Sequence, residues 1–335
     1  IFSTNGQGAL SLVIVIFGVS IAAFLIGYAA FFSDRSAQIF FNLIKYLSLA
    51  SAVIMVIALI AGQHAVYQEI TVARISFLGL DIDQRIMGRP PFYRYGGLMG
   101  NPNAAGYYLS FGFIVWMKID RRALSVKKVL ILSILFFGIL LTGSRGALLA
   151  LLVPSSLTAL RTKTGRRKLI FISSGIVLFL ILVNKDMLIE HLRISSGLSS
   201  RDLAWAFLYS GILESSFWGN GFGSSFQYLQ AKGLEFGAHN GYLSMYFEIG
   251  PLGFIIFILT TIYPLYLCFI NNRVTMDPKS RAYSSAILTF YIAILFGNLF
   301  ESFLFRLSAM HIIALFCIGA LVNLNGNNIS RKMGP

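Results

Sequence analysis

Residues 10–32 read LSLVIVIFGVSIAAFLIGYAAFF, a run without a charged side chain. A helix needs about 20 apolar residues to cross the ~30 Å hydrocarbon core of a bilayer, and this run meets that requirement. The whole 335-residue chain is 56% hydrophobic and only 12% charged. Because soluble domains carry about 25% charged residues, the composition excludes an ordinary soluble protein. The sequence predicts an all-α, polytopic helical membrane protein with a single integral membrane domain.

Similar apolar runs predict about nine membrane spans in all. They cover residues 10–32, 40–60, 103–118, 129–142, 146–160, 169–183, 251–270, 282–299 and 308–323. Two long segments interrupt the series, at about 61–102 and 184–250. We expect the second of them to be a large loop that contains short helices.

Basic residues decide the orientation of these spans. Segments 118–128 and 161–168 contain five lysines and arginines each, and the net charge of the chain is +14. Lysine and arginine collect in the short cytoplasmic loops of membrane proteins, so these segments are expected inside and both long segments outside. The positive charge therefore reports topology and does not indicate a nucleic-acid partner. With nine spans the first residue also lies outside, and we expect further N-terminal helices in the native protein.

Cysteine and acidic residues do not suggest a metal site. Cys268 and Cys317 lie inside apolar runs, and the sequence has no Cys/His spacing typical of metal binding. Asp81 and Asp83 form an acidic pair without an evident third ligand, whereas hard cations take several oxygen ligands. The sequence thus predicts no metal and no cofactor.

Two arginines in or near the outer segments are candidate anion-binding residues. Arg145 lies in a very short turn between two predicted spans, where a charged side chain is expensive and is usually paired or functional. Snorkelling to lipid headgroups is the alternative. Arg201 lies in the first turn of a predicted helix, against the helix dipole, which suggests an anionic partner. An ion pair with Asp202 is the alternative there.

His239 is the candidate base. It precedes the helix-like run that continues to Glu248 and Gly250. A neutral imidazole can accept a proton from a hydroxyl near pH 7. A hydrogen-bonded structural histidine is the alternative. Nine residues place Glu248 on the opposite helix face, so we do not expect Glu248 to orient His239.

A base and two arginines on the outer side suit glycosyl transfer from a lipid diphosphate sugar. Arginine's planar fork matches diphosphate oxygens. A lipid-anchored donor would also explain why the enzyme lies in a membrane. A glycolipid flippase or transporter is the alternative of another class, since it also needs arginines for diphosphate but does not need a histidine.

Five motifs resemble the O-antigen ligase and polymerase family. They are GNPN (100–103), TGSRGALLAL (142–151), RDLAW (201–205), GNGFGSSF (219–226) and AHNGYLSMYFEIGPLGF (238–254). The resemblance implies a GT-C-type fold of about twelve spans in the bacterial inner (cytoplasmic) membrane, with the active site facing outward. It also implies a metal-independent, inverting glycosyltransferase that uses undecaprenyl diphosphate-linked glycan.

The resemblance assigns roles to individual residues. His239 corresponds to the family's essential histidine, and Arg201 and Arg145 correspond to its diphosphate-binding arginines. Further donor or acceptor contacts are expected from residues beside the motifs, namely Arg85, Arg89, Arg94, Asn101, Asn103 and Asn240. A ligase transfers the glycan to lipid A–core, whereas a polymerase transfers it to another lipid-linked chain. The shared motifs leave this choice open, and we favour the ligase because HNGYL and TGSRG match it more closely.

Overall fold

A computed structural model describes most of the chain. The described residues are 6–67, 70–77, 80–88, 93–119, 125–159, 201–215, 217–271, 278–302 and 309–332. They belong to two compact units, one of Ile1–Gln38 with Leu198–Pro335 and the other of Ile39–Gly197. The predicted span over residues 169–183 lies outside the described residues.

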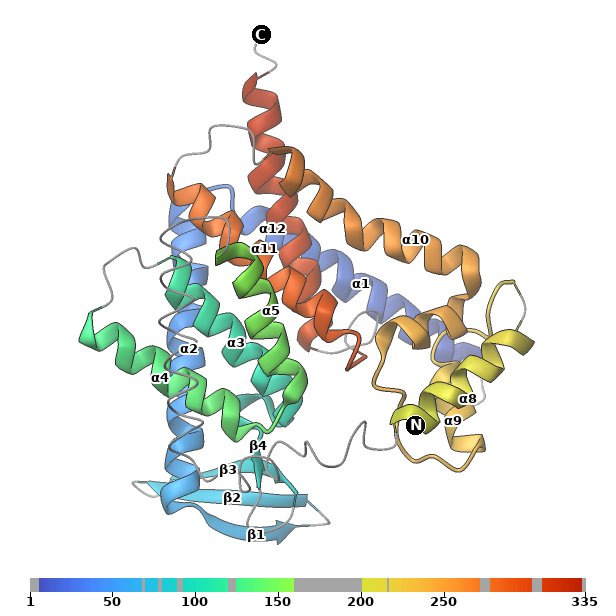
Figure 1. Cartoon of the computed structure of the whole chain (residues 1–335), viewed down its shortest axis with the longest axis horizontal. Helices are drawn as coiled ribbons and strands as arrows, with labels where there is room; N and C mark the ends of the chain where they lie inside the picture. Colours follow the sequence, from blue (N-terminus) through green and yellow to red (C-terminus); the bar gives the residue numbers. More distant parts are fainter. Residues whose placement is uncertain are drawn as a thin grey trace. The chain divides into compact units, whose positions relative to one another are not determined.

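The first unit is helical (Figure 1). Its helices are α1 (Gly6–Ala30), α8 (Arg201–Glu214), α9 (Ser224–Ala231), α10 (Gly241–Asn271), α11 (Pro278–Gly297) and α12 (Ala309–Lys332). Helices α1 and α12 cross closely at two glycines. A Cβ atom on Gly27 would lie 2.1 Å from the carbonyl oxygen of Phe316, and one on Gly319 would lie 2.1 Å from that of Phe24. Small residues of this kind let helix backbones approach closely in membranes.

The second unit is built around a buried helix. It contains most of α2 (Asp34–Ala61), with α3 (Pro102–Lys118), α4 (Val126–Leu141) and α5 (Arg145–Ala159). Almost every side chain of α3 is buried, because α4 and α5 both pack on it. A Cβ on Gly138 of α4 would lie 3.0 Å from Ala52 of α2, so this glycine allows the two helices to come close.

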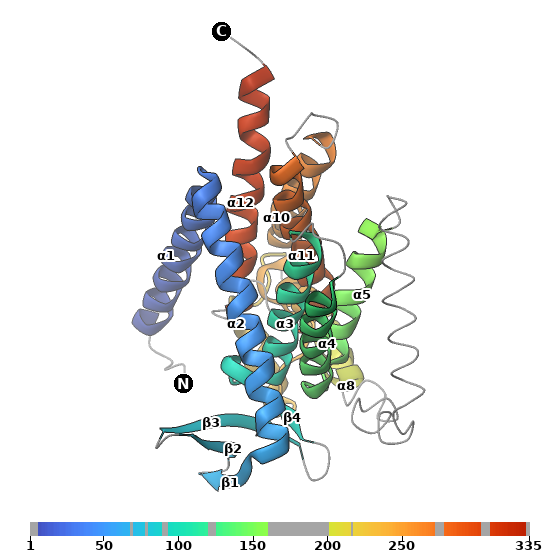
Figure 2. The same ribbon diagram turned by 90° about the vertical axis from the view of Figure 1, so that its left-hand side faces the viewer.

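The segment between α2 and α3 contradicts the all-α prediction. It forms a four-stranded antiparallel sheet of β1 (Gln63–Tyr67), β2 (Ile70–Phe77), β3 (Leu80–Met87) and β4 (Arg94–Tyr95), in that order, followed by a short 3-10 helix, η1 (Gly97–Met99). Figure 2 shows the sheet at the end of α2. The letters ITVARISF and LDIDQRIM are rich in β-branched residues and mix polar with apolar side chains, as half-buried strands do. The sequence prediction treated this segment only as a polar gap between spans.

Each of the remaining predicted spans overlaps a helix over most of its length, which confirms the predominantly helical class. Two helical stretches, Asp34–Ile60 and Gly241–Cys268, are long and apolar enough to cross a membrane. Three described helices carry shorter apolar stretches, Gly18–Ala30, Arg145–Ser156 and Met310–Leu324. The full set of nine crossings stays a prediction.

Helix α10 begins about ten residues before the predicted membrane span and includes the helix-like run expected after His239. The expected start of the span was residue 251, whereas the helix begins at Gly241 and bends at Gly250, which has non-helical torsion angles (φ 65°, ψ −179°). Pro251 follows the bend, and its ring prevents a regular helical hydrogen bond there. Figure 1 shows the short arm that precedes the bend and the long arm that follows it. The short arm carries the HNGYL motif.

Candidate functional site

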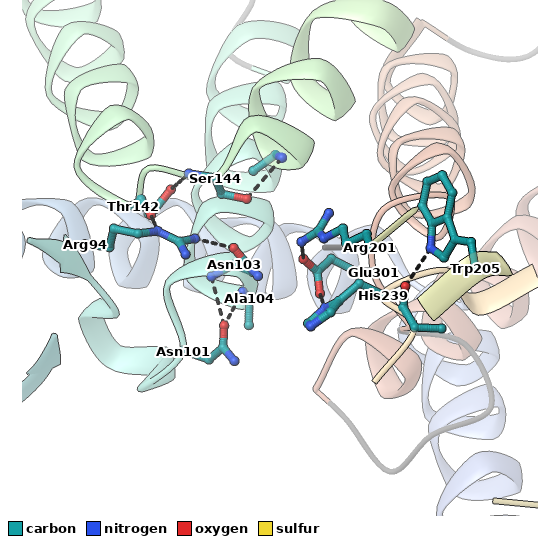
Figure 3. Close-up of polar contacts among 12 residues, drawn as sticks. Arg94, Asn101, Asn103, Ala104, Thr142, Ser144, Arg201, Trp205, His239 and Glu301 are labelled. Atoms are coloured by element: carbon teal, nitrogen blue, oxygen red, sulfur yellow. Dashed lines mark hydrogen bonds and ion pairs between the residues drawn. The ribbon is translucent and has the colours of Figure 1, made fainter. Parts of the chain in front are cut away.

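Two side chains from distant parts of the first unit meet at one carboxylate, that of Glu301. His239 Nδ1 lies 3.0 Å from Glu301 Oε2, and Arg201 Nη2 donates to Glu301 Oε1 at 3.1 Å. Figure 3 shows Glu301 between the two, with one oxygen directed toward each. The glutamate side chain is only 11% exposed, whereas that of His239 is 36% exposed. The histidine is thus held by a nearly buried carboxylate and stays accessible from solvent.

Backbone contacts fix the segment that carries His239. The Asn240 side chain accepts from Leu243 N at 3.0 Å and caps α10, so His239 stands immediately before the cap. Gly241 N donates to the carbonyl oxygens of Asn298, at 2.7 Å, and of Glu301, at 3.2 Å. The start of α10 and the turn after α11 are therefore joined directly. Asn240, a predicted substrate contact, is used here to cap the helix.

His239 also has an unusual backbone conformation. Its φ angle is +49°, and among the described residues it is the non-glycine residue with positive φ. Such conformations cost about 1–3 kcal/mol and persist where surrounding contacts impose them, often at functional sites. Gly241 adds a second constraint, because a Cβ there would lie 2.1 Å from Asn298 Oδ1. The local structure therefore determines the direction of the imidazole.

Packing of α8 positions Arg201. One face of this helix buries Ala204 and Leu208 in a cluster with Leu229, Ala238 and Phe247. The Trp205 indole N–H donates to the carbonyl oxygen of Ala238 at 2.7 Å, next to His239 in the chain. The RDLAW motif thus places an arginine on Glu301 and a tryptophan on the histidine segment. Asp202, the alternative partner of Arg201, is exposed.

The contact with Glu301 favours one tautomer of a neutral His239. A carboxylate beside Nδ1 accepts its hydrogen, which leaves the lone pair of a neutral imidazole on Nε2. This is the geometry in which an acidic side chain orients a histidine for general-base chemistry. Arg201 uses one of the five N–H donors of its guanidinium on Glu301, so donors remain for an anionic ligand.

The sequence analysis rejected Glu248 as the carboxylate that orients His239 and did not pair His239 with Glu301. Glu301 lies 62 residues beyond His239 in the chain. The available signal was an acidic residue at the outer end of an apolar run. The expectation for Glu248 is confirmed, since its carboxylate accepts from Gly223 N at 2.9 Å and from the Ser225 hydroxyl.

Glu248 joins the GNGFGSSF loop to the short arm of α10. Two more backbone bonds support the join, because Asn220 N donates to Phe247 O at 3.1 Å and Gly221 N to Glu248 O at 2.9 Å. At the crossing, a Cβ on Gly219 would lie 2.4 Å from Gly250 N. The glycines of this loop therefore allow close backbone packing and local turns, and no phosphate-binding loop needs to be invoked.

A second polar cluster lies in the other unit and joins the GNPN and TGSRG motifs. Arg94 Nε donates to the Thr142 carbonyl at 2.8 Å, and its Nη2 donates to Asn103 Oδ1 (Figure 3). Asn101 Oδ1 accepts from Asn103 N at 2.9 Å and from Ala104 N at 3.3 Å, so it caps α3. Arg94, Asn101 and Asn103 were predicted to contact substrate, and here they stabilise the helix ends.

The other predicted residues are placed as follows. Arg145 is the first residue of α5 and is half-buried. Arg85 lies in β3 with an exposed side chain, and its carbonyl accepts from Gly96 N at 3.0 Å. Arg89 lies outside the described residues. The structure thus brings His239 and Arg201 together, while Arg145 and Arg94 belong to the second unit.

Within the part of the chain that the structure describes, no three metal-binding side chains form a cluster. Asp81 and Asp83 lie in β3, and in the register of the sheet they stand opposite Ser76 and Arg74 of β2.

Part of the chain matches the model of a known protein family. Residues 130–258 match the family model described as O-antigen ligase, a stretch that contains Arg145, Arg201 and His239. No curated protein matches the chain by sequence. The family match supports a glycosyltransferase of the ligase or polymerase type and a membrane location. The match confirms the resemblance of the motifs, and residues 130–258 of this chain are similar to the O-antigen ligase family.

Proposed function

We propose that this chain transfers a glycan from undecaprenyl diphosphate to an acceptor hydroxyl on the outer side of the bacterial inner membrane. The observation that carries the proposal is the contact of His239 Nδ1 with Glu301 Oε2 at 3.0 Å. A histidine in a purely structural role does not require a nearly buried carboxylate that also contacts an arginine. His239 is the proposed general base, and Glu301 is the residue that positions it.

The proposed reaction is a single displacement. His239 Nε2 takes the proton of the acceptor hydroxyl, and the oxygen attacks the anomeric carbon of the donor sugar. The bond from that carbon to the diphosphate oxygen breaks, and undecaprenyl diphosphate leaves with the electron pair. Attack from the side opposite the leaving group inverts the anomeric configuration. General-base catalysis of this kind contributes about 10²–10⁴-fold to a rate.

Arg201 is the proposed partner of the leaving diphosphate. Negative charge grows on the departing oxygen, and a guanidinium close to it would lower the energy of the transition state. Glu301 already neutralises part of the charge of Arg201 but engages one N–H of its fork. Arg145 is proposed as a second diphosphate contact on the strength of its motif. Neither role requires a metal ion.

The acceptor distinguishes the members of the family. We favour lipid A–core, which makes the protein a ligase, and a lipid-linked glycan acceptor would make it a polymerase. A flippase is the less favoured function, because transport of a lipid diphosphate does not require a base held as His239 is.

The test uses purified full-length protein in EDTA with undecaprenyl diphosphate-linked glycan, with and without lipid A–core. Glycan that appears on lipid A–core supports a metal-independent ligase. A lengthening lipid-linked ladder without that acceptor supports a polymerase. Transfer that is restored only by a divalent metal would overturn the mechanism, as would full transfer by His239→Ala. Lipid transport without any glycosyl transfer would support the flippase.

A further inference from the structure

Helix α8 has apolar residues on two opposite faces. Ala204, Leu208 and Gly211 are buried against the rest of the first unit. Leu203, Tyr209 and Leu213 lie on the other side and are exposed, with Leu213 at 71%. The exposed charged residues of α8, Asp202 and Glu214, lie at its two ends, and residues 203–213 between them contain no charged side chain. A surface helix of a globular protein normally carries charged residues along its outer face, whereas an apolar outer face is typical of contact with another surface or with lipid.

Exposed aromatic residues continue this face beyond the end of the helix. Trp218 is 72% exposed and Phe217 59%, and their rings contact each other edge to face with centroids 5.6 Å apart. Phe222 is also exposed. We call Leu203, Tyr209, Leu213, Phe217, Trp218 and Phe222 the aromatic face. Large apolar patches that are exposed on a protein usually mark an interaction surface.

The aromatic face is continuous with the apolar surface of a membrane-spanning helix. The exposed residues on the long arm of α10 recur at helical spacing along one side, and they are Leu252, Ile255, Ile256, Leu259, Ile262, Tyr263 and Tyr266. Gly250, where this arm begins, lies against the backbone of Phe217, Trp218 and Gly219, because a Cβ there would fall 2.3–2.8 Å from their atoms. Figure 1 shows α8 close to the bend of α10.

The length of α10 between its two groups of aromatic residues is close to the thickness of a bilayer's hydrocarbon core. Sixteen residues separate Gly250 from Tyr266, which corresponds to about 24 Å of helix at 1.5 Å per residue. The apolar side of α10 is thus bounded by Trp218 at one end and by Tyr263 and Tyr266 at the other. Tryptophan and tyrosine gather at both edges of the ~30 Å hydrocarbon core. A bilayer crossed by α10 between these two groups of aromatic residues would have the aromatic face at one of its edges.

We propose that the aromatic face is embedded in the outer headgroup region of the bilayer. The bilayer would then anchor α8, and with it Arg201, at the level where a lipid diphosphate lies. Bilayer lipid is the occupant because the face continues the lipid-facing side of α10 and ends in paired aromatic rings. This proposal concerns how the protein sits in the membrane and does not depend on the transfer reaction.

The test is a depth measurement in nanodiscs of phosphatidylethanolamine and phosphatidylglycerol. The buried Cys268 and Cys317 are replaced by alanine in the full chain, and a nitroxide is attached to Trp218→Cys or, separately, to Leu213→Cys. Both side chains are exposed, so the labels remove no core contacts. The matched control carries the label at Gln230→Cys, an exposed position of α9. Collision with oxygen, which dissolves in lipid, is compared with collision with a water-soluble nickel complex.

We expect the labels at positions 213 and 218 to be protected from nickel and accessible to oxygen, and the label at 230 to show the reverse. Equal access of nickel to all three positions would overturn the proposal. Protection that develops only after undecaprenyl diphosphate is added would assign the face to the donor's tail and would also overturn it. Dipolar coupling between two labels at position 218 would assign the face to a second copy, with the same consequence.

Discussion

Glu301 contacts two side chains whose roles depend on its charge, so a neutral replacement of similar size is informative. In Glu301→Gln the amide oxygen can still accept from Arg201, but the amide N–H then donates to His239 Nδ1 and favours the tautomer in which Nε2 carries the hydrogen. We expect transfer to fall at least about 10–100-fold, by analogy with the loss of carboxylates that orient metal-binding histidines. Initial rates with saturating donor measure this, and kcat should fall more than KM rises.

Two control variants distinguish a loss of His239 orientation from a general loss of protein stability. Glu301→Asp keeps the charge and should recover part of the rate. Glu235→Gln removes a carboxylate from an exposed position of the same unit and should leave the rate unchanged. If Glu301→Gln transfers glycan as fast as the native chain while remaining folded, Glu301 does not position the base.

Glu248 has a structural role in the same unit. Its carboxylate accepts hydrogen bonds from Gly223 N and Ser225 Oγ and is buried. Because hydrogen bonds to charged groups contribute about 1.5–3 kcal/mol each, Glu248→Ala should destabilise the loop that contains GNGFGSSF. Hydrogen exchange at the Gly223 amide should accelerate by at least tenfold. The exposed Glu235→Ala is the control, and unchanged exchange at Gly223 would show that the loop does not depend on Glu248.

At the scale of elements, the close packing of the GNGFGSSF loop on α10 can be tested with two neighbouring glycines. Gly219 and Gly221 both have positive φ, of 80° and 94°. A Cβ on Gly219 would lie 2.4 Å from Gly250 N, whereas nothing lies within 4 Å of one on Gly221. Both alanine variants carry the backbone strain of about 1 kcal/mol or more, but only Gly219→Ala also forces the loop away from α10.

We therefore expect Gly219→Ala to lower the melting temperature in detergent clearly more than Gly221→Ala does. The steric clash is with backbone atoms, which cannot move aside as a flexible side chain can. Equal melting temperatures for the two variants would mean that the loop and helix α10 do not pack as closely as the structure indicates.

The same elements show what sequence reasoning can predict. Apolar runs located the helices well, because the length of a membrane span is set by the bilayer and each run is read locally. The sheet of β1–β4 was missed, since its main strands mix polar with apolar side chains and therefore contain no long apolar run. His239 and Arg201 were found from their motifs. Glu301 was not, because its contact with His239 joins residues 62 positions apart and depends on how α10 and α11 pack.

At the scale of the whole molecule, the first unit has two chemically different ends. Helix α11 runs from Pro278 to Gly297, and its 20 residues span about 30 Å. Glu301, which contacts His239 and Arg201, follows its C-terminal end. At the other end Lys279 pairs with Asp34 at 3.1 Å, next to the basic segment that the sequence analysis predicts to be cytoplasmic. The proposed chemistry and the predicted cytoplasmic segment thus lie at opposite ends of one helix.

This arrangement predicts the sidedness of chemical labelling in the membrane. In a chain whose Cys268 and Cys317 are replaced by alanine, Gln230→Cys should react with a membrane-impermeant maleimide in intact spheroplasts. Arg281→Cys, at the exposed start of α11, should react only after the membrane is permeabilised. The reverse pattern would place His239 in the cytoplasm, away from the side on which the donor is proposed to be used. The proposed reaction would then fail, whereas the packing of His239 on Glu301 would be unaffected by that result.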